Sequence, residues 1–287
     1  MSVHLPTTVD AAVELLAADP AATVLAGGTD LMVEINEGHR RPSGSLVVTN
    51  RIAELRSWRH DPTTGVVRIG AAVTYRELMQ EPLAAWFPAL AHASRTVGSP
   101  QIRNAGTLGG NLGTCSPAGD GLPALAALEA TVELASVDGR RTMPVRDFMV
   151  GVKRTALAPG ELIVSIDVPV VDGYQAYAKV GVRNAMVIAV ATACVVLDPR
   201  RQRAAIALGS VGPTILRCPD AEALVEQSID WSSRRVPPEV ADEAGRLVSA
   251  ASRPITDHRS TAEYRRHAVG VLARRLLRRA DDAEVAA

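Results

Sequence analysis

Two glycine-rich segments contain the residue types in this sequence that could bind a charged ligand. The first runs from Val24 to Leu31 and reads VLAGGTDL. The pattern indicates a strand that ends at Gly27 and Gly28 and is followed by small polar side chains. Consecutive backbone N–H groups in such a turn can form a nest that binds anions, and a residue without a Cβ lets a phosphate approach closely. The segment therefore predicts a phosphate site. The alternative is that it is only a structural Gly-Gly turn without a ligand.

The second segment, from Gly106 to Gly113, reads GTLGGNLG and lies within a polar stretch that extends from 98 to 121. We expect this stretch to be a loop, and a loop of this length inside a compact domain is usually functional. Two separate polar Gly-Gly loops suit a ligand with two phosphates and a polar chain between its rings, and FAD is such a ligand. The sequence has no P-loop motif. Its one G-x-G-x-x-A match, which begins at Gly119, follows no strand and is accidental.

The composition excludes several other classes of function. The chain has 287 residues, of which 47% are hydrophobic and 22% charged, and its formal net charge is zero, so neither a nucleic acid nor a membrane surface is indicated as a partner. Its three cysteines are far apart, which argues against a zinc ribbon or a protein-held iron–sulfur cluster. We therefore expect no metal bound by this chain alone. The first residues lack a secretory signal, and the longest apolar run, 186–197, is too short to span a membrane, so we expect a cytoplasmic protein.

The elements expected before residue 172 alternate between helices and strands. Thr7 and Asp10 form a capping-box-like pair at the first helix, and Thr74 can cap another. We expect helices at 8–18, 51–58, 75–80, 82–97 and 122–130, strands at 23–26, 45–49, 66–72 and 161–170, and a hairpin of 131–137 and 141–144.

The order of the expected elements changes beyond Asp172. We expect three strands at 175–180, 186–197 and 203–209, the middle one buried on both faces, and then helices at 220–227, 238–252 and 261–279. The last helix carries three arginine pairs, at 265–266, 274–275 and 278–279. We interpret these pairs as the solvated face of an amphipathic helix rather than as a surface for an acidic partner.

Three segments together carry a resemblance to a known family. The stretch from Gly98 to Asp120, GSPQIRNAGTLGGNLGTCSPAGD, resembles the FAD signature of the xanthine dehydrogenase and carbon monoxide dehydrogenase flavoproteins. The AGGTDL loop from Ala26 to Leu31 resembles that family's first flavin loop, and YAKVGVRN, from Tyr177, also matches. The order and spacing of the three segments agree with the family pattern over essentially the whole chain.

The resemblance implies an α+β fold. Residues 1–171 would form a vanillyl-alcohol-oxidase-like (PCMH-type) FAD-binding domain with subdomains at about 1–58 and 59–171. Residues 172–287 would form a domain like the carbon monoxide dehydrogenase flavoprotein C-terminal domain, a three-stranded sheet with a helical bundle. This division agrees with the change in the order of expected elements near Asp172.

The resemblance also implies positions for the cofactor contacts. Asp120 would accept hydrogen bonds from ribityl or ribose hydroxyls. The alternative, which is compatible with this role, is that Asp120 caps the following helix. Lys179 would place a positive charge near the cofactor, and Ile188 would lie against the isoalloxazine, where no aromatic residue is present. Taken alone, Val97, Ile163 and Ile188 would be ordinary core residues. The full set comprises Val24, Leu25, Ala26, Gly27, Gly28, Thr29, Asp30, Leu31, Val97, Thr107, Gly109, Gly110, Asn111, Asp120, Ile163, Lys179 and Ile188.

The family resemblance implies an electron-transfer role. The chain would be the FAD-binding medium subunit of a molybdenum hydroxylase, an oxidoreductase in which a small [2Fe-2S] subunit and a large molybdenum cofactor subunit supply the other centres, assembled as a dimer of heterotrimers. No catalytic acid, base or nucleophile is expected, because the chemistry belongs to the cofactor. NAD, oxygen or a quinone could accept the electrons. The alternatives are a stand-alone FAD oxidoreductase with its own substrate and a non-catalytic assembly protein.

Overall fold

The computed structural model describes residues 2–280, which form two compact units. Within this range the first unit comprises 2–77, 100–115 and 129–169, and the second comprises 78–99, 116–128 and 170–280. Each unit is therefore built from three separate stretches of chain. The predicted cofactor residues are divided between the two units.

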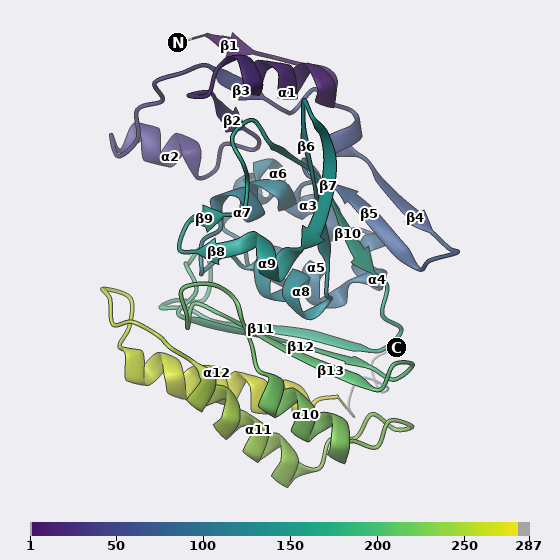
Figure 1. Ribbon diagram of the computed structural model, residues 1–287. Coiled ribbons are helices and arrows are strands. Elements are labelled where there is room, and N and C mark those ends of the chain that lie inside the picture. The colour runs from purple at the N-terminus through teal and green to yellow at the C-terminus, as the bar shows by residue number, and fades with distance from the viewer. Residues whose placement is uncertain (1, 281–287) are drawn as a thin grey trace. The chain divides into compact units, whose positions relative to one another are not determined.

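The first unit contains a small parallel sheet and a larger antiparallel sheet (Figure 1). The small sheet has the order β1-β3-β2, with β1 Val3–His4, β2 Thr23–Leu25 and β3 Leu46–Val48. The larger sheet has the order β4-β5-β10-β6-β7, with β4 Trp58–Asp61, β5 Val66–Gly70, β10 Leu162–Pro169, β6 Thr131–Ser136 and β7 Gly139–Pro144. A short hairpin pairs β8 Met149–Gly151 with β9 Arg154–Thr155.

Short helices complete the first unit. They are α1 Val9–Ala18, α2 Leu31–Asn36, α3 Tyr75–Leu78, α6 Pro100–Ala105, α7 Leu108–Thr114 and α9 Val145–Phe148, with the 3₁₀ turn η1 Glu54–Arg56. In α1, Val9, Val13 and Leu16 are buried on one face, as the spacing predicted. The cap is Thr8, whose side chain accepts a hydrogen bond from the Ala11 N–H, and the predicted Thr7–Asp10 capping pair is wrong.

Two further predictions for the first unit are wrong. The segment 51–58 is not one helix, because only η1 is helical and Trp58 pairs with Ile69 at the edge of the larger sheet. The polar stretch 98–121 is not a loop but holds α6 and α7. Glycine, asparagine and threonine have low helix propensity. Tertiary contacts therefore stabilise α7, in which Gly109 donates a hydrogen bond to the Ala71 carbonyl at 2.8 Å.

The second unit is a sheet covered by helices on both faces (Figure 1). The antiparallel order is β11-β12-β13-β14, with β11 Tyr174–Val180, β12 Ala191–Asp198, β13 Arg203–Gly209 and β14 Leu216–Arg217. One face packs against α5 Pro88–Arg95 and α8 Gly121–Ala127, near α4 Leu83–Trp86. The other face packs against α10 Pro219–Ser228 and α12 Ala262–Arg278, and α11 Pro238–Ala251 packs against these two helices.

Four details of the second unit differ from the sequence prediction. The middle strand begins at Ala191, and the residues before it belong to the loop that joins β11 to β12. The predicted helix 82–97 is divided at Phe87, because Pro88 starts a new helix. The sheet has a short fourth strand, β14. Arg265 is only 2% exposed, so the prediction of a fully solvated arginine face is wrong at this position.

Within residues 2–280, no helix is both long enough and apolar enough to cross a membrane.

Candidate cofactor site

The first glycine loop joins β2 to α2 in the first unit. The strand ends at Leu25, and Gly28 has a φ of +70°, in the left-handed region that favours glycine. The whole segment from Val24 to Thr29 is half-buried, and Asp30 is exposed. The Met32 N–H donates a hydrogen bond to the Gly28 carbonyl at 3.0 Å, which starts the helix.

The backbone N–H groups of this loop are available for an anion. From Ala26 to Leu31, none of them donates a hydrogen bond to any residue among 2–280. Buried or half-buried N–H groups are normally paired, and successive N–H groups around a left-handed residue form an anion-binding concavity. The geometry therefore supports the phosphate prediction for the first loop.

The two glycine loops pack against each other within the first unit. A Cβ added to Gly27 would lie 1.8 Å from the Ala105 carbonyl oxygen, just before the second loop. A Cβ added to Gly110 would lie 3.8 Å from the Ala26 Cβ. Gly27 is therefore required by contact between the two backbones, in addition to any role toward a ligand.

The N–H groups of the second loop are already used inside the protein. Leu108 donates to the Val73 carbonyl and Gly109 to the Ala71 carbonyl. The Gly110 N–H donates to the Thr107 hydroxyl at 3.0 Å, and the Asn111 N–H donates to the Thr107 carbonyl. This loop thus differs from the first, because its N–H groups from Leu108 to Asn111 are not available for an anion.

The second loop offers a side-chain acceptor instead. The Oδ1 atom of Asn111 is buried and accepts no hydrogen bond from any residue that the structure describes. A buried acceptor without a donor costs about 1–3 kcal/mol, so it suits a ligand that brings a hydroxyl or an N–H. Free N–H donors on one loop and a free acceptor on the other fit a ligand that carries both phosphates and hydroxyls.

Ile163 lies beside α7 in the first unit. Its side chain is 7% exposed, and its Cδ1 would be 3.6 Å from a Cβ added to Gly113. The pairing of β10 with β6 shifts register between Ile163 and Ser165. Such a bulge re-aims the side chains next to it. The prediction that Ile163 contacts the cofactor stays a prediction.

Asp120 belongs to a buried charged cluster in the second unit. Its carboxylate accepts hydrogen bonds from the Tyr177 hydroxyl at 2.9 Å and from the Lys179 ammonium at 2.7 Å. Lys179 also donates to the Thr96 carbonyl at 3.2 Å. Asp120 makes no side-chain cap to α8, so the alternative of a simple helix cap is wrong. The Thr96 side chain also interacts with this carboxyl group. Since a carboxylate has about four lone-pair sites, it can still accept a hydrogen bond from another donor.

The cluster is strongly desolvated. The side chains of Lys179 and Asp120 are only 7% and 8% exposed. Burial raises the pKa of the Asp120 carboxyl, while the charge and hydrogen bonds of Lys179 oppose this shift. Burial and the Asp120 charge likewise raise the pKa of Tyr177 well above its ordinary value, so its hydroxyl acts as a donor.

Two predicted contact residues of the second unit are not core residues. Ile188 is 58% exposed and lies in the loop between β11 and β12, where Val182 and Met186 are also exposed. Val97 is half-buried in the turn after α5, where its N–H donates to the Ser94 carbonyl. The alternative prediction, that Val97 and Ile188 are ordinary buried core residues, is therefore wrong.

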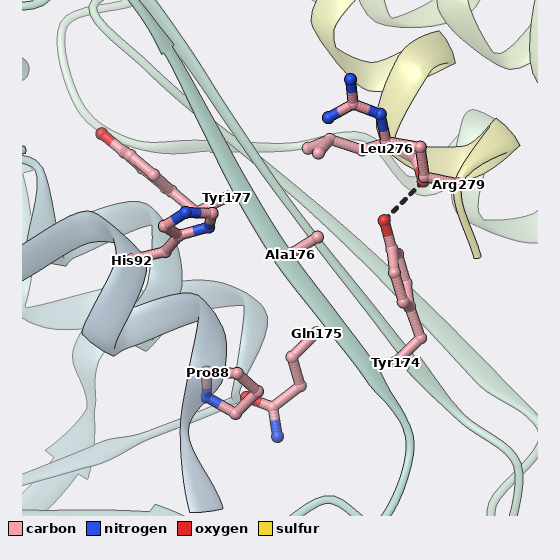
Figure 2. A pocket seen from close by; sticks show the side chains of 8 residues that line it. All are labelled: Pro88, His92, Tyr174, Gln175, Ala176, Tyr177, Leu276 and Arg279. Atoms are coloured by element: carbon pink, nitrogen blue, oxygen red, sulfur yellow. Dashed lines mark hydrogen bonds between the residues drawn. The ribbon is translucent and has the colours of Figure 1, made fainter. Parts of the chain in front are cut away.

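A separate cavity of about 400 Å³ lies in the second unit, along the edge strand β11 between α5 and the end of α12 (Figure 2). Figure 2 shows Pro88 and His92 on one side of the strand and Leu276 and Arg279 on the other. None of the predicted cofactor residues lines this cavity, whose lining residues are Pro88, His92, Tyr174, Gln175, Ala176, Tyr177, Leu276 and Arg279.

Sequence reasoning missed Tyr177 and Thr96 as members of the Asp120 cluster. Period-two alternation places Tyr177 on the same face of β11 as Lys179, and this signal could have identified the tyrosine. Thr96 participates through its backbone carbonyl, which accepts from Lys179, and through its side chain, which lowers the pKa of Asp120.

Comparison with known proteins identifies two family domains. Residues 1–171 match the FAD binding domain in molybdopterin dehydrogenase, and residues 175–280 match the CO dehydrogenase flavoprotein C-terminal domain. The chain is 34% identical to the carbon monoxide dehydrogenase medium chain of Afipia carboxidovorans, over 96% of this chain and 95% of that one. It is 32% identical to the nicotine 6-hydroxylase medium subunit of Paenarthrobacter nicotinovorans, over 95% of this chain and 94% of that one. It superposes on a chain of carbon monoxide dehydrogenase from Hydrogenophaga pseudoflava with a TM-score of 0.89 and 32% identity, covering 99% of this chain and 97% of that one.

Proposed function

The chain belongs to the FAD-subunit family of the xanthine and carbon monoxide dehydrogenases, and from this premise we propose that it carries electrons from iron–sulfur clusters on a partner subunit to an external acceptor. It is an oxidoreductase subunit, and its cofactor is FAD. When bound, FAD accepts electrons singly and releases them in pairs, and this chemistry belongs to the cofactor. The residues of this chain bind and orient it.

We propose that the first glycine loop holds the FAD pyrophosphate. The unpaired N–H groups from Ala26 to Leu31 are the observation that carries this assignment. Asn111 Oδ1 would accept a hydrogen bond from a cofactor hydroxyl, with Thr107 and Gly110 shaping the loop around it. Gly109 would contribute by close packing, because its N–H is bonded to Ala71. Ile163 would add an apolar contact.

For the second unit, we propose the contacts that the family resemblance implies. Asp120 would accept hydrogen bonds from ribityl or ribose hydroxyls, and Lys179 would provide positive charge while it holds the Asp120 carboxylate. The exposed Ile188 would lie against the isoalloxazine, and Val97 would make an apolar contact. The hydrogen bonds to Asp120 from Tyr177 and Lys179 support the first of these roles by fixing the carboxylate.

The finer architecture belongs to the same proposal. The FAD-binding domain would be of the PCMH type, with a domain boundary at 171/172 and subdomains at about 1–58 and 59–171. The partners would be a small [2Fe-2S] subunit and a large molybdenum cofactor subunit in a dimer of heterotrimers in the cytoplasm. Support comes from relatives that are medium subunits.

A ligand series tests the pyrophosphate assignment. The chain is stripped of flavin and titrated with riboflavin, FMN and FAD, and binding is followed by flavin fluorescence. Hydrogen bonds to charged groups contribute about 1.5–3 kcal/mol each, so two bonds to the pyrophosphate predict FAD binding roughly 10²–10⁴-fold tighter than riboflavin. Equal affinity for the three flavins would contradict the assignment.

Electron transfer is tested in the assembled complex. Hydroxylation of one substrate molecule, with water as the source of the oxygen atom, releases two electrons and two protons, and these are enough to reduce one FAD to FADH₂. We expect substrate to bleach the flavin absorbance in the complex and to leave it unchanged in the isolated chain. Bleaching of the isolated chain by a substrate of its own would instead support a stand-alone oxidoreductase.

A further inference from the structure

Arg265 is a buried cation on α12 with no direct part in the proposed cofactor contacts. Its side chain is 2% exposed, although the helix around it is rich in solvated arginines. Removing a guanidinium from water is costly, and an apolar side chain of similar size often stabilises a core equally well. The hydrogen-bond partners of Arg265 show what the charge holds in place.

The guanidinium of Arg265 joins three segments. Its Nη1 donates to the Val190 carbonyl at 2.9 Å and to the Ser210 carbonyl at 3.1 Å. Its Nη2 donates to Asp257 at 2.6 Å. A planar fork of donors suits this arrangement, and the single ammonium of a lysine does not reproduce it. Arg265 therefore fixes the end of the β11–β12 loop against the turn after β13.

Ser210 extends this connection to a second loop. Its hydroxyl donates to the Ala189 carbonyl at 3.0 Å, and its N–H donates to the Pro117 carbonyl at 2.7 Å. Its φ of +61° lies in the left-handed region, which is uncommon for serine. One turn thus holds both the loop that carries Ile188 and the loop that leads to Asp120.

We propose that Arg265 and Ser210 are positioning residues for the flavin contacts of the second unit. Arg265 holds the Val190 carbonyl and the Ser210 turn in position through its hydrogen bonds. The Ser210 turn in turn holds the loop before Asp120 and the loop that contains Ile188. The inference rests on the proposed function, since it assumes that these two residues contact FAD. It goes beyond that function by naming a buried network that touches no cofactor and yet determines its affinity and environment.

Two variants test the proposal in the whole chain. Arg265→Lys keeps the charge but cannot bond both carbonyls and Asp257 together. Ser210→Gly removes the bond to Ala189 and relaxes the backbone, because glycine tolerates a positive φ, so this variant is expected to fold even if the first does not. Arg278→Lys is the matched control, because Arg278 lies on the same helix, is exposed and pairs with Asp242.

The measurements are the dissociation constant for FAD, the flavin reduction potential and the melting temperature. We expect both test variants to bind FAD roughly tenfold more weakly or worse, by analogy with the loss of a hydrogen bond to a contact group, and to shift the flavin potential. We expect the control to match the wild type in all three measurements.

A purely structural role would lower the melting temperature alone. If Arg265→Lys and Ser210→Gly keep the wild-type FAD affinity and potential, the proposal is overturned. A wild-type chain that takes up no FAD would instead overturn the proposed function, and this inference with it.

Discussion

Replacing Lys179 with methionine would leave the Asp120 carboxylate buried without its cation. The Lys179 Nζ lies 2.7 Å from Asp120 Oδ2, and both side chains are more than nine-tenths buried. Removing one partner of a buried ion pair costs about 3–5 kcal/mol, because the other charge stays desolvated. We expect Lys179→Met to lower the free energy of unfolding by about this amount, measured by urea denaturation with circular dichroism.

The chain provides a matched control. Its sequence has only two lysines, and the other, Lys153, also lies 2.7 Å from a carboxylate, that of Glu34. That pair is exposed, at 59% and 28% of the two side chains. Exposed pairs contribute about 0–1 kcal/mol, so Lys153→Met should change stability little. Equal losses from the two variants would refute the reasoning from burial.

The effect of Lys179→Met should also depend on pH. Burial raises the folded-state pKa of Asp120 above its ordinary value of 3.8, and without Lys179 the opposing influence is lost. A carboxyl whose pKa is raised by folding stabilises the fold below its unfolded pKa, and this stabilisation is lost as the pH rises through the folded pKa. The deficit of the variant should therefore be smaller at pH 5 than at pH 8. A deficit that grows on acidification would contradict this assignment.

Three further substitutions test the glycine loops. Gly110→Val should abolish FAD binding while leaving much of the fold, since its Cβ would lie 2.8 Å from the Thr107 hydroxyl, and stoichiometric FAD in the purified variant would contradict this. Gly27→Ala should separate the two loops, because its Cβ would lie 1.8 Å from the Ala105 carbonyl oxygen; FAD content and the melting temperature should fall together. Asn111→Ala should weaken FAD binding by about 1–3 kcal/mol, and a fluorescence titration with unchanged affinity would show that Oδ1 receives no cofactor donor.

Much of the fold could be predicted from the sequence because its pattern is local. The apolar spacing of α1 and the alternation in β10 identify a helix and a strand directly. The spacing could not identify α7, whose sequence LGGNLGT has poor helix propensity and whose position depends on contacts with Ala71 and Val73. The sequence pattern also could not show that Ile188 lies outside β12, because an apolar run has the same appearance in a buried strand and in an exposed loop.

The candidate site was predictable to a similar degree. The first glycine loop is recognisable because consecutive small residues allow free N–H groups to converge. The second loop looks the same in sequence, but its N–H groups are bonded to Ala71, Val73 and Thr107. Only the folded chain reveals this difference, and only the folded chain shows that Arg265 is buried among backbone carbonyls.

The absorbance spectrum of the purified protein, with the released cofactor identified after denaturation, tests the central claim most directly. The account predicts the bands of an oxidised flavin and the release of one FAD for each chain. A protein that is purified with its partner subunits, contains no flavin and takes up no added FAD would contradict it.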